Sequence, residues 1–206
     1  MPEETFLSDL RRAREEEYFR KQDQALIEEQ RRRVLRETEK RTVGAVIGIS
    51  DEHLVTELLD EGFTAERIPL LYLVPALEVA WADGSVSDSE QEWLLKFACE
   101  RGANRDSPAY GQLLAWLADK PPAEFLASTL RLIGSVCQAQ SPFEAESTVT
   151  KVTSYCSQIA EASGNWLGLG SKVSRTEAQV LERITSFLRE RIPTAIRRTS
   201  GGVHGE

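Results

Sequence analysis

Hydrophobic residues recur at helical spacing along most of the chain, and no stretch shows the period-two alternation typical of a β-strand. Residues 64–80 are hydrophobic nearly all round, which predicts a buried central helix, kinked at Pro75. Amphipathic helices are expected at 51–60, 88–101, 107–118, 122–139, 142–162 and 174–190. The pattern therefore predicts an all-α bundle built around residues 64–80.

Residues 3–41 show a different pattern, with many charged side chains and sparse apolar ones. The segment lacks glycine, with acidic residues near its start and basic residues near its end, as the helix dipole favours. We therefore expect one long charged helix. Its apolar residues do not hold a heptad; they are Phe6, Leu7, Leu10, Tyr18, Phe19, Leu26, Ile27, Val34 and Leu35. Such a helix is either a solvated arm or a surface that docks onto a partner or its own domain, with Tyr18 and Phe19 as candidate contacts.

The domain boundaries follow from these patterns. Residues 42–49 contain two glycines among small residues and are expected to connect the arm to the rest of the chain. This predicts a charged helical arm at 1–42, a helical domain at 43–190 and a flexible tail at 191–206.

Charge is distributed unevenly between these parts. The net charge of the chain is −8, while residues 1–42 hold eleven basic and eleven acidic residues. The excess of acidic residues therefore lies in residues 43–206. An acidic domain argues against nucleic-acid binding and favours cationic partners, metal ions among them.

Residues that carry catalytic chemistry are too few to predict an enzyme. The only histidines are His53 and His204, and the chain has no HExxH motif, no glycine-rich loop between a strand and a helix, and no CxxC pair. Cys99, Cys137 and Cys156 are expected to be reduced, buried thiols. The charged N-terminus is unlike a signal peptide and no apolar run approaches 18 residues, so a soluble, cytoplasmic protein is expected.

The turn after the central helix carries the most specific signal. It reads Ala82-Asp83-Gly84-Ser85-Val86-Ser87-Asp88-Ser89-Glu90. Ser87 followed by Glu90 is a capping box, in which the hydroxyl accepts from the Glu90 N–H and the carboxylate accepts from the Ser87 N–H. Asp83, Ser87 and Glu90 also match the back half of an EF-hand loop, whose first and third ligand positions fall here on Val79 and Trp81. The turn thus supplies about half of the six to eight oxygens that Ca²⁺ takes.

Two interpretations of this turn remain open. It is a helix cap alone, contributing about 1 kcal/mol, or it is a divalent-cation site with Asp83, Ser87 and Glu90 as ligands and Ca²⁺ as the favoured ion. Glu78, a carboxylate on an otherwise apolar helix, also needs a partner. It either pairs with an arginine or lysine or leans toward the turn as an extra ligand.

A degraded copy of the motif returns near the C-terminus. Ala162-Ser163-Gly164 aligns with Ala82-Asp83-Gly84, and the pattern Val-Ser-x-x-Glu recurs at Val173, Ser174 and Glu177. An apolar helix precedes each copy and an amphipathic helix follows it. We therefore expect two helix–turn–helix units packed about a pseudo-twofold axis, each burying the face that the other exposes.

This arrangement, over about residues 50–190, resembles the TerB-like family associated with tellurite resistance. The resemblance implies an all-α bundle whose acidic residues take part in metal-ion binding and in stress-linked, membrane-associated complexes. It assigns the family's acidic turn to Asp83 and Glu90. In the second copy Ser163 replaces the aspartate, so only Glu177 is a candidate ligand there and a second metal site is incomplete.

Two other segments are candidate partner-binding surfaces. The loop at 165–170 places Trp166, Leu167 and Leu169 among glycines, and it either tucks its tryptophan into the bundle or offers an apolar tip to a partner or a membrane. Residues 15–33 resemble the N-terminal arm of the ATP-synthase zeta-type inhibitor family, which implies an interaction role for that stretch.

The sequence predicts a non-enzymatic, TerB-like interaction module that responds to a divalent metal and binds partner proteins through the arm or the 165–170 loop. Peripheral association with membrane complexes is part of this expectation. The alternative is a structural or scaffolding helical protein, or an adaptor acting through its N-terminal helix, in which the acidic turns serve only as helix caps.

Overall fold

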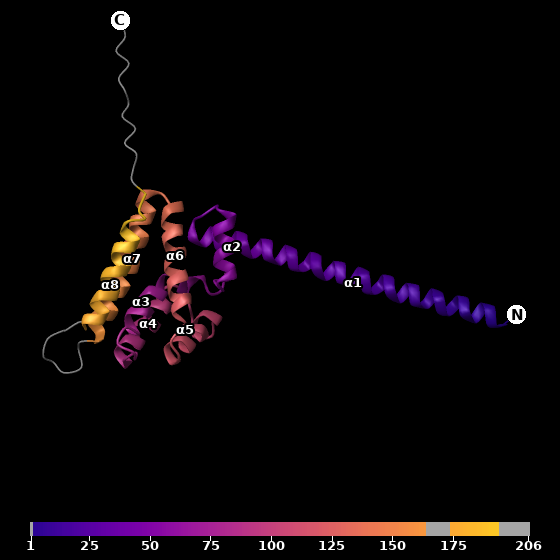
Figure 1. Cartoon of the computed structure of the whole chain (residues 1–206), viewed down its shortest axis with the longest axis horizontal. Coiled ribbons are helices and arrows are strands. Elements are labelled where there is room, and N and C mark those ends of the chain that lie inside the picture. Colours follow the sequence, from indigo (N-terminus) through magenta and orange to yellow (C-terminus); the bar gives the residue numbers. More distant parts are fainter. Residues whose placement is uncertain (1, 164–173, 194–206) are drawn as a thin grey trace, which may run out of the picture. The chain divides into compact units, whose positions relative to one another are not determined.

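The computed structural model describes residues 2–163 and 174–193, and all regular secondary structure in those ranges is helical (Figure 1). The helices are α1 (Pro2–Ile47), α2 (Glu52–Asp60), the 3-10 helix η1 (Ile68–Leu73), α3 (Val74–Ala80), α4 (Asp88–Glu100), α5 (Pro108–Ala118), α6 (Ala123–Ala139), α7 (Pro142–Ser163) and α8 (Arg175–Arg189). The predicted all-α class is confirmed.

The chain divides into two compact units, Met1–Thr42 and Val43–Glu206. The first unit consists of most of α1, and its side chains are exposed from residue 16 to residue 38. Ion pairs one turn apart support this helix, such as Lys21 Nζ to Glu17 Oε1 at 2.8 Å. Because both side chains of such a pair are exposed to solvent, each pair adds little to stability.

The predicted connector at 42–49 is wrong for residues 42–47, which continue α1. Val43 and Ile47 lie one turn apart and are buried in the core of the second unit, so packing outweighs the glycine content. Gly44 allows a close approach, since a Cβ there would lie 3.0 Å from the Ile49 carbonyl oxygen. Gly48, at φ 76°, ends the helix in the left-handed region.

The apolar segment after α2 forms the centre of the second unit, as predicted, but it is divided into η1 and α3 rather than being one helix. Each element has a proline in its first turn. The backbone N–H groups of a first turn have no carbonyl acceptor within the helix, so the absence of an N–H in proline removes no hydrogen bond there. Pro75, where the kink was expected, lies at the junction between the two. Helix α3 packs against α6, α7 and α8, and Glu78 is its only residue that is not buried.

The remaining helices cover this segment. Helices α6, α7 and α8 lie side by side, and α4 packs against α7 (Figure 1). The largest fully buried side chains that these four helices contribute are Leu94, Ile133, Ile159, Ile184 and Leu188. Trp81, Trp93 and Trp116, which the sequence also suggested for the core, are partly buried against it. None of the described helices combines the length and the apolar character needed to cross a bilayer.

The three cysteines are free thiols, but only two are buried. Burial raises the pKa of Cys137 to about 11, and it also raises the pKa of Cys156 above its ordinary value. Cys99 is exposed, so the expectation of three buried thiols was wrong. The buried face of α4 runs through Leu94, Phe97 and Ala98, and Cys99 lies beside that face rather than on it.

Candidate functional site

The first acidic motif folds as a helix cap. Gly84 turns the chain at φ 99°, and Asp83 Oδ1 accepts a hydrogen bond from the Ser85 N–H at 3.2 Å. Ser87 is the N-cap of α4, and its Oγ accepts from the Glu90 N–H at 3.3 Å. Glu90 Oε2 accepts from the N–H and the hydroxyl of Ser87, both at 2.7 Å. The capping box that the sequence suggested is therefore present.

Glu90 is unusual because an ionisable side chain is only 2% exposed. Its Oε2 is used by the cap, whereas Oε1 is buried without a hydrogen-bond partner in the described part of the chain. Burial raises the pKa of Glu90 to about 6, the hydrogen bonds from Ser87 oppose this shift, and the charges of Glu177 and Asp83 add to it. The interior thus disfavours the charged form of this carboxyl.

The second motif repeats the first. Ser174 caps α8, its Oγ accepts from the Glu177 N–H at 3.1 Å, and Glu177 Oε2 accepts from the Ser174 N–H at 2.8 Å. Glu177 is fully buried. Because the charge of Glu177 raises the pKa of Glu90, the two repeated glutamates lie within electrostatic range of each other. The sequence suggested each motif but not this convergence of their carboxylates.

The other candidate metal ligand is engaged differently. Glu78 on α3 pairs with Arg183 on α8, with 2.6 Å between Oε1 and Nη2. Across the described ranges, no three His, Cys, Asp or Glu side chains are grouped so that they could hold a metal ion. One oxygen of Asp83 and the Ser87 hydroxyl are used in local turns, so the geometry in hand is that of two helix caps whose glutamates interact electrostatically.

The first unit carries exposed apolar side chains. Among residues 16–42, whose side chains the structure describes, six large ones are 52–68% exposed, and we call them the six arm side chains: Tyr18, Phe19, Leu26, Ile27, Val34 and Leu35. They form adjacent pairs that recur every eight residues. Residues four apart are neighbours on a helix. The first residues of the three pairs therefore lie on one row of residues spaced four apart, and the second residues lie on the adjacent row. In each row a polar residue separates one apolar residue from the next.

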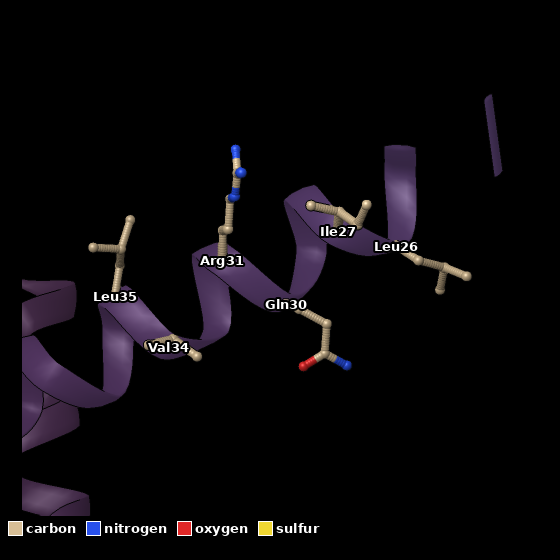
Figure 2. Close-up of a pocket in the computed structure, with 6 residues that line it drawn as sticks. All are labelled: Leu26, Ile27, Gln30, Arg31, Val34 and Leu35. Carbon is tan, nitrogen blue, oxygen red and sulfur yellow. The ribbon is translucent and has the colours of Figure 1, made fainter. Parts of the chain in front are cut away.

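Figure 2 shows part of these rows. Leu26, Gln30 and Val34 belong to one row and Ile27, Arg31 and Leu35 to the next, and together they line a shallow hollow formed by this helix alone. In the close-up Arg31 and Leu35 project to one side and Gln30 to the other. The rows offer an apolar surface that a second helix or an extended segment could cover.

A pocket of about 270 Å³ lies beside the start of α7, and sequence reasoning missed it; we call it the α7 pocket. It combines two exposed apolar side chains, Val46 and Phe143, with two basic ones, Arg101 and Lys151. The pattern contained a signal, because Phe143 lies about 200° around the helix from Ala145, which begins the buried face of α7. A large aromatic residue off the buried face points to an exposed apolar site.

The remaining candidates, Trp166, Leu167 and Leu169, lie outside the described residues. No protein-family model matches this chain, and no curated protein or solved structure matches it. The functional argument therefore rests on the surfaces described above.

Proposed function

We propose that this chain is a non-enzymatic interaction module that binds partner proteins through α1. The observation that carries the proposal is the exposure of the six arm side chains, each more than half exposed. Isolated large apolar residues are common on protein surfaces, but pairs that recur regularly along one helix are typical of an interaction surface. Successive pairs are rotated by about 80° around α1, so this surface winds around the helix.

Covering these side chains would contribute binding free energy. Full burial of a large apolar side chain contributes about 1.5–3 kcal/mol, so burying the exposed half of each contributes roughly 1 kcal/mol. The six arm side chains together supply roughly 6 kcal/mol, which is similar to the cost of association. Micromolar affinity corresponds to about 8 kcal/mol net, so the partner must also form contacts with the charged residues of α1.

The second unit gives this module its scaffold. A TerB-like arrangement of two related helix–turn–helix units is supported by the capping boxes at the starts of α4 and α8, whose buried glutamates converge. The TerB resemblance adds a stress-linked complex, peripheral to a membrane and on its cytoplasmic side, as the setting for the interaction.

Affinity capture with the full chain as bait tests the proposal. One variant changes Leu26, Ile27 and Leu35 to serine, and a control changes two exposed polar residues off the rows, Gln24 and Arg33, to serine. Circular dichroism first establishes that both variants keep the helical content of the parent. A partner retained by the parent and the control, and at least tenfold depleted with the apolar variant, supports the proposal; equal recovery with all three baits contradicts it.

A second candidate function is a response to a divalent cation. The observation favouring it is the buried Glu90 Oε1, which has no hydrogen-bond partner in the described residues and lies within electrostatic range of Glu177 and Asp83. A cation would neutralise the Glu90 carboxylate, whose charged form the interior disfavours. Calcium is the favoured ion because every donor here is an oxygen.

Isothermal titration of Ca²⁺, then Mg²⁺ and Zn²⁺, into chelator-stripped protein tests this candidate. Glu90→Gln removes a charge from the candidate site, and Glu144→Gln is a matched control because Glu144 forms a similar but exposed box with Ser141 on α7. Saturable binding by the parent and by Glu144→Gln, lost in Glu90→Gln, supports a cation site. Binding that survives Glu90→Gln, or its absence from the parent, leaves the motif as a cap alone.

A further inference from the structure

The α7 pocket holds two basic side chains, and no carboxylate of the described residues forms an ion pair with either of them. Arg101 donates its Nε–H to the Pro69 carbonyl oxygen at 2.9 Å and stacks over Tyr72, with 4.9 Å from its guanidinium carbon to the ring centroid. A guanidinium has five N–H donors, so most of them are left for a ligand. Neither Arg101 nor Lys151 takes part in any of the ion pairs found in the described ranges.

The one acidic residue that lines the pocket is already engaged. Glu144 Oε2 accepts a hydrogen bond from the Ser141 hydroxyl at 2.6 Å and another from the Ser141 N–H at 3.1 Å. These bonds hold the pKa of Glu144 below its usual value. The two cations therefore face the pocket in a unit whose overall charge is strongly negative, which makes this a local site for an anion.

The apolar side chains that line the pocket are exposed to solvent. Phe143 is 81% exposed and Val46 is 63% exposed, which are among the highest values for large apolar side chains in the described structure. A volume of about 270 Å³ is slightly less than that of typical small-molecule sites, and it suits one or two side chains. The chemistry of the pocket thus fits an aromatic or large apolar side chain flanked by carboxylates.

Such a segment exists on α1. Residues 15–19 read Glu-Glu-Glu-Tyr-Phe, and the rings of Tyr18 and Phe19 are exposed and meet edge to face with 5.9 Å between centroids. Aromatic rings add a favourable interaction with Arg and Lys that aliphatic side chains do not offer. Arg20 and Lys21 follow the two rings, and Lys21 is paired with Glu17, so the acidic part of this segment is the part before Tyr18. The pair Val34 and Leu35 has an arginine directly before it and another directly after it, and the cations of the pocket would repel both.

We propose that the α7 pocket of one chain receives the acidic–aromatic segment 15–19 of a second copy. Tyr18 and Phe19 pack against Phe143 and Val46 of the other copy, while Glu16 and Glu17 face Arg101 and Lys151. This inference rests on the proposed function, because it names one partner of α1. Since each copy carries both the segment and the pocket, two copies can satisfy each other reciprocally.

Sedimentation equilibrium of the full chain, at concentrations from micromolar to about a millimolar, tests the proposal. A monomer–dimer equilibrium is expected, and it weakens as salt screens the contacts. Lys151→Glu and Phe143→Ser are each expected to weaken the dimer at least tenfold, and both positions are exposed, so the fold is retained. Glu17→Lys combined with Lys151→Glu restores part of the loss, because the two charges are exchanged.

Two controls make the test specific. Arg105→Glu changes the charge as Lys151→Glu does, at an exposed residue that does not line the pocket, and it should leave the dimer unchanged. Leu114→Ser removes an exposed apolar side chain that lies outside segment 15–19 and outside the pocket, and it should also be neutral. A chain that stays monomeric throughout overturns the inference. A dimer that is insensitive to Lys151→Glu and Phe143→Ser, or one that Leu114→Ser breaks equally, also overturns it.

The outcome is separable from that of the proposed function. A monomeric chain that still captures another protein through the six arm side chains leaves the proposed function standing and removes only the self-association. A dimer with the expected sensitivities supports the inference whether or not affinity capture finds a further partner.

Discussion

The sharpest prediction concerns the pH dependence of stability at two capping boxes of the same chemistry. Glu90 and Glu144 both accept hydrogen bonds from the serine three residues before them, but Glu90 is buried and Glu144 is exposed. Burial raises the pKa of Glu90, whereas the hydrogen bonds from Ser141 lower the pKa of Glu144. The two residues should therefore affect stability with opposite signs as the pH changes.

The magnitude for Glu90 follows from its pKa of about 6 in the folded protein, against an ordinary value of 4.5. Because the folded state binds this proton more tightly, the stabilisation is fully present below about pH 4.5 and is lost as the pH rises through about 6. One pKa unit corresponds to about 1.36 kcal/mol, so the full shift is worth about 2 kcal/mol, and solvent screening reduces it to between about 1 and 2 kcal/mol. For Glu144 the sign is reversed, and its contribution is present at neutral pH and lost as the pH falls through its lowered pKa.

Urea unfolding of the parent, Glu90→Gln and Glu144→Gln between pH 4 and about pH 7.5, with a chelator present, measures these contributions. Glutamine does not titrate, so the difference in unfolding free energy between the parent and each variant isolates one carboxyl. The parent should lose about 1–2 kcal/mol relative to Glu90→Gln as the pH rises, and it should gain stability relative to Glu144→Gln over the same range. A Glu90 difference that is independent of pH, or that has the same sign as the Glu144 difference, would refute the assignment of a buried, charge-disfavoured carboxyl.

Three other outcomes are expected. A chain that begins at Thr42 should melt within about 2 °C of the full chain, since residues 16–38 bury no side chain, and a larger loss by calorimetry would show that the arm supports the core. Arg183→Met should destabilise the bundle by about 1 kcal/mol at neutral pH, because it leaves the mostly buried Glu78 unpaired, and a double-mutant cycle with Glu78→Gln should give a favourable coupling rather than none. Titration with a thiol reagent under native conditions should modify Cys99 rapidly and Cys137 and Cys156 only on unfolding, whereas equal rates for all three would contradict their burial.

Much of the fold could be predicted from the sequence because helical periodicity and capping residues are local signals. Ser87 and Ser174 marked the starts of α4 and α8 correctly, since a capping box lies within four residues of sequence. The end of α1 was misjudged because its outcome depends on Val43 and Ile47 packing against residues distant in the chain. Glycine content weighs against a helix locally, but burial in the core outweighs it.

The candidate sites were predictable to different degrees. The exposure of Tyr18 and Phe19 could be predicted because the residues three and four positions away from them on the helix are all polar, and their role as a binding site stays a prediction. The convergence of Glu90 with Glu177, and of Arg101 with Lys151, depends on the packing of helices far apart in sequence, so no local pattern could reveal either. The amino-acid composition indicates an acidic chain, and it contains no information about where basic residues gather in the folded protein.

The central claim is that the exposed apolar rows of α1 bind a protein partner, and site-specific photo-crosslinking in the cells that make the protein tests it most directly. A photoreactive amino acid is placed in turn at Phe19, at Leu26 and at Leu35, and at Gln24 as a control off the rows. The account predicts discrete crosslinked products from the three apolar positions, identifiable by mass spectrometry, and a much weaker yield from Gln24. Equal yields from all four positions, or none from any of them, would contradict the claim that α1 is a binding surface.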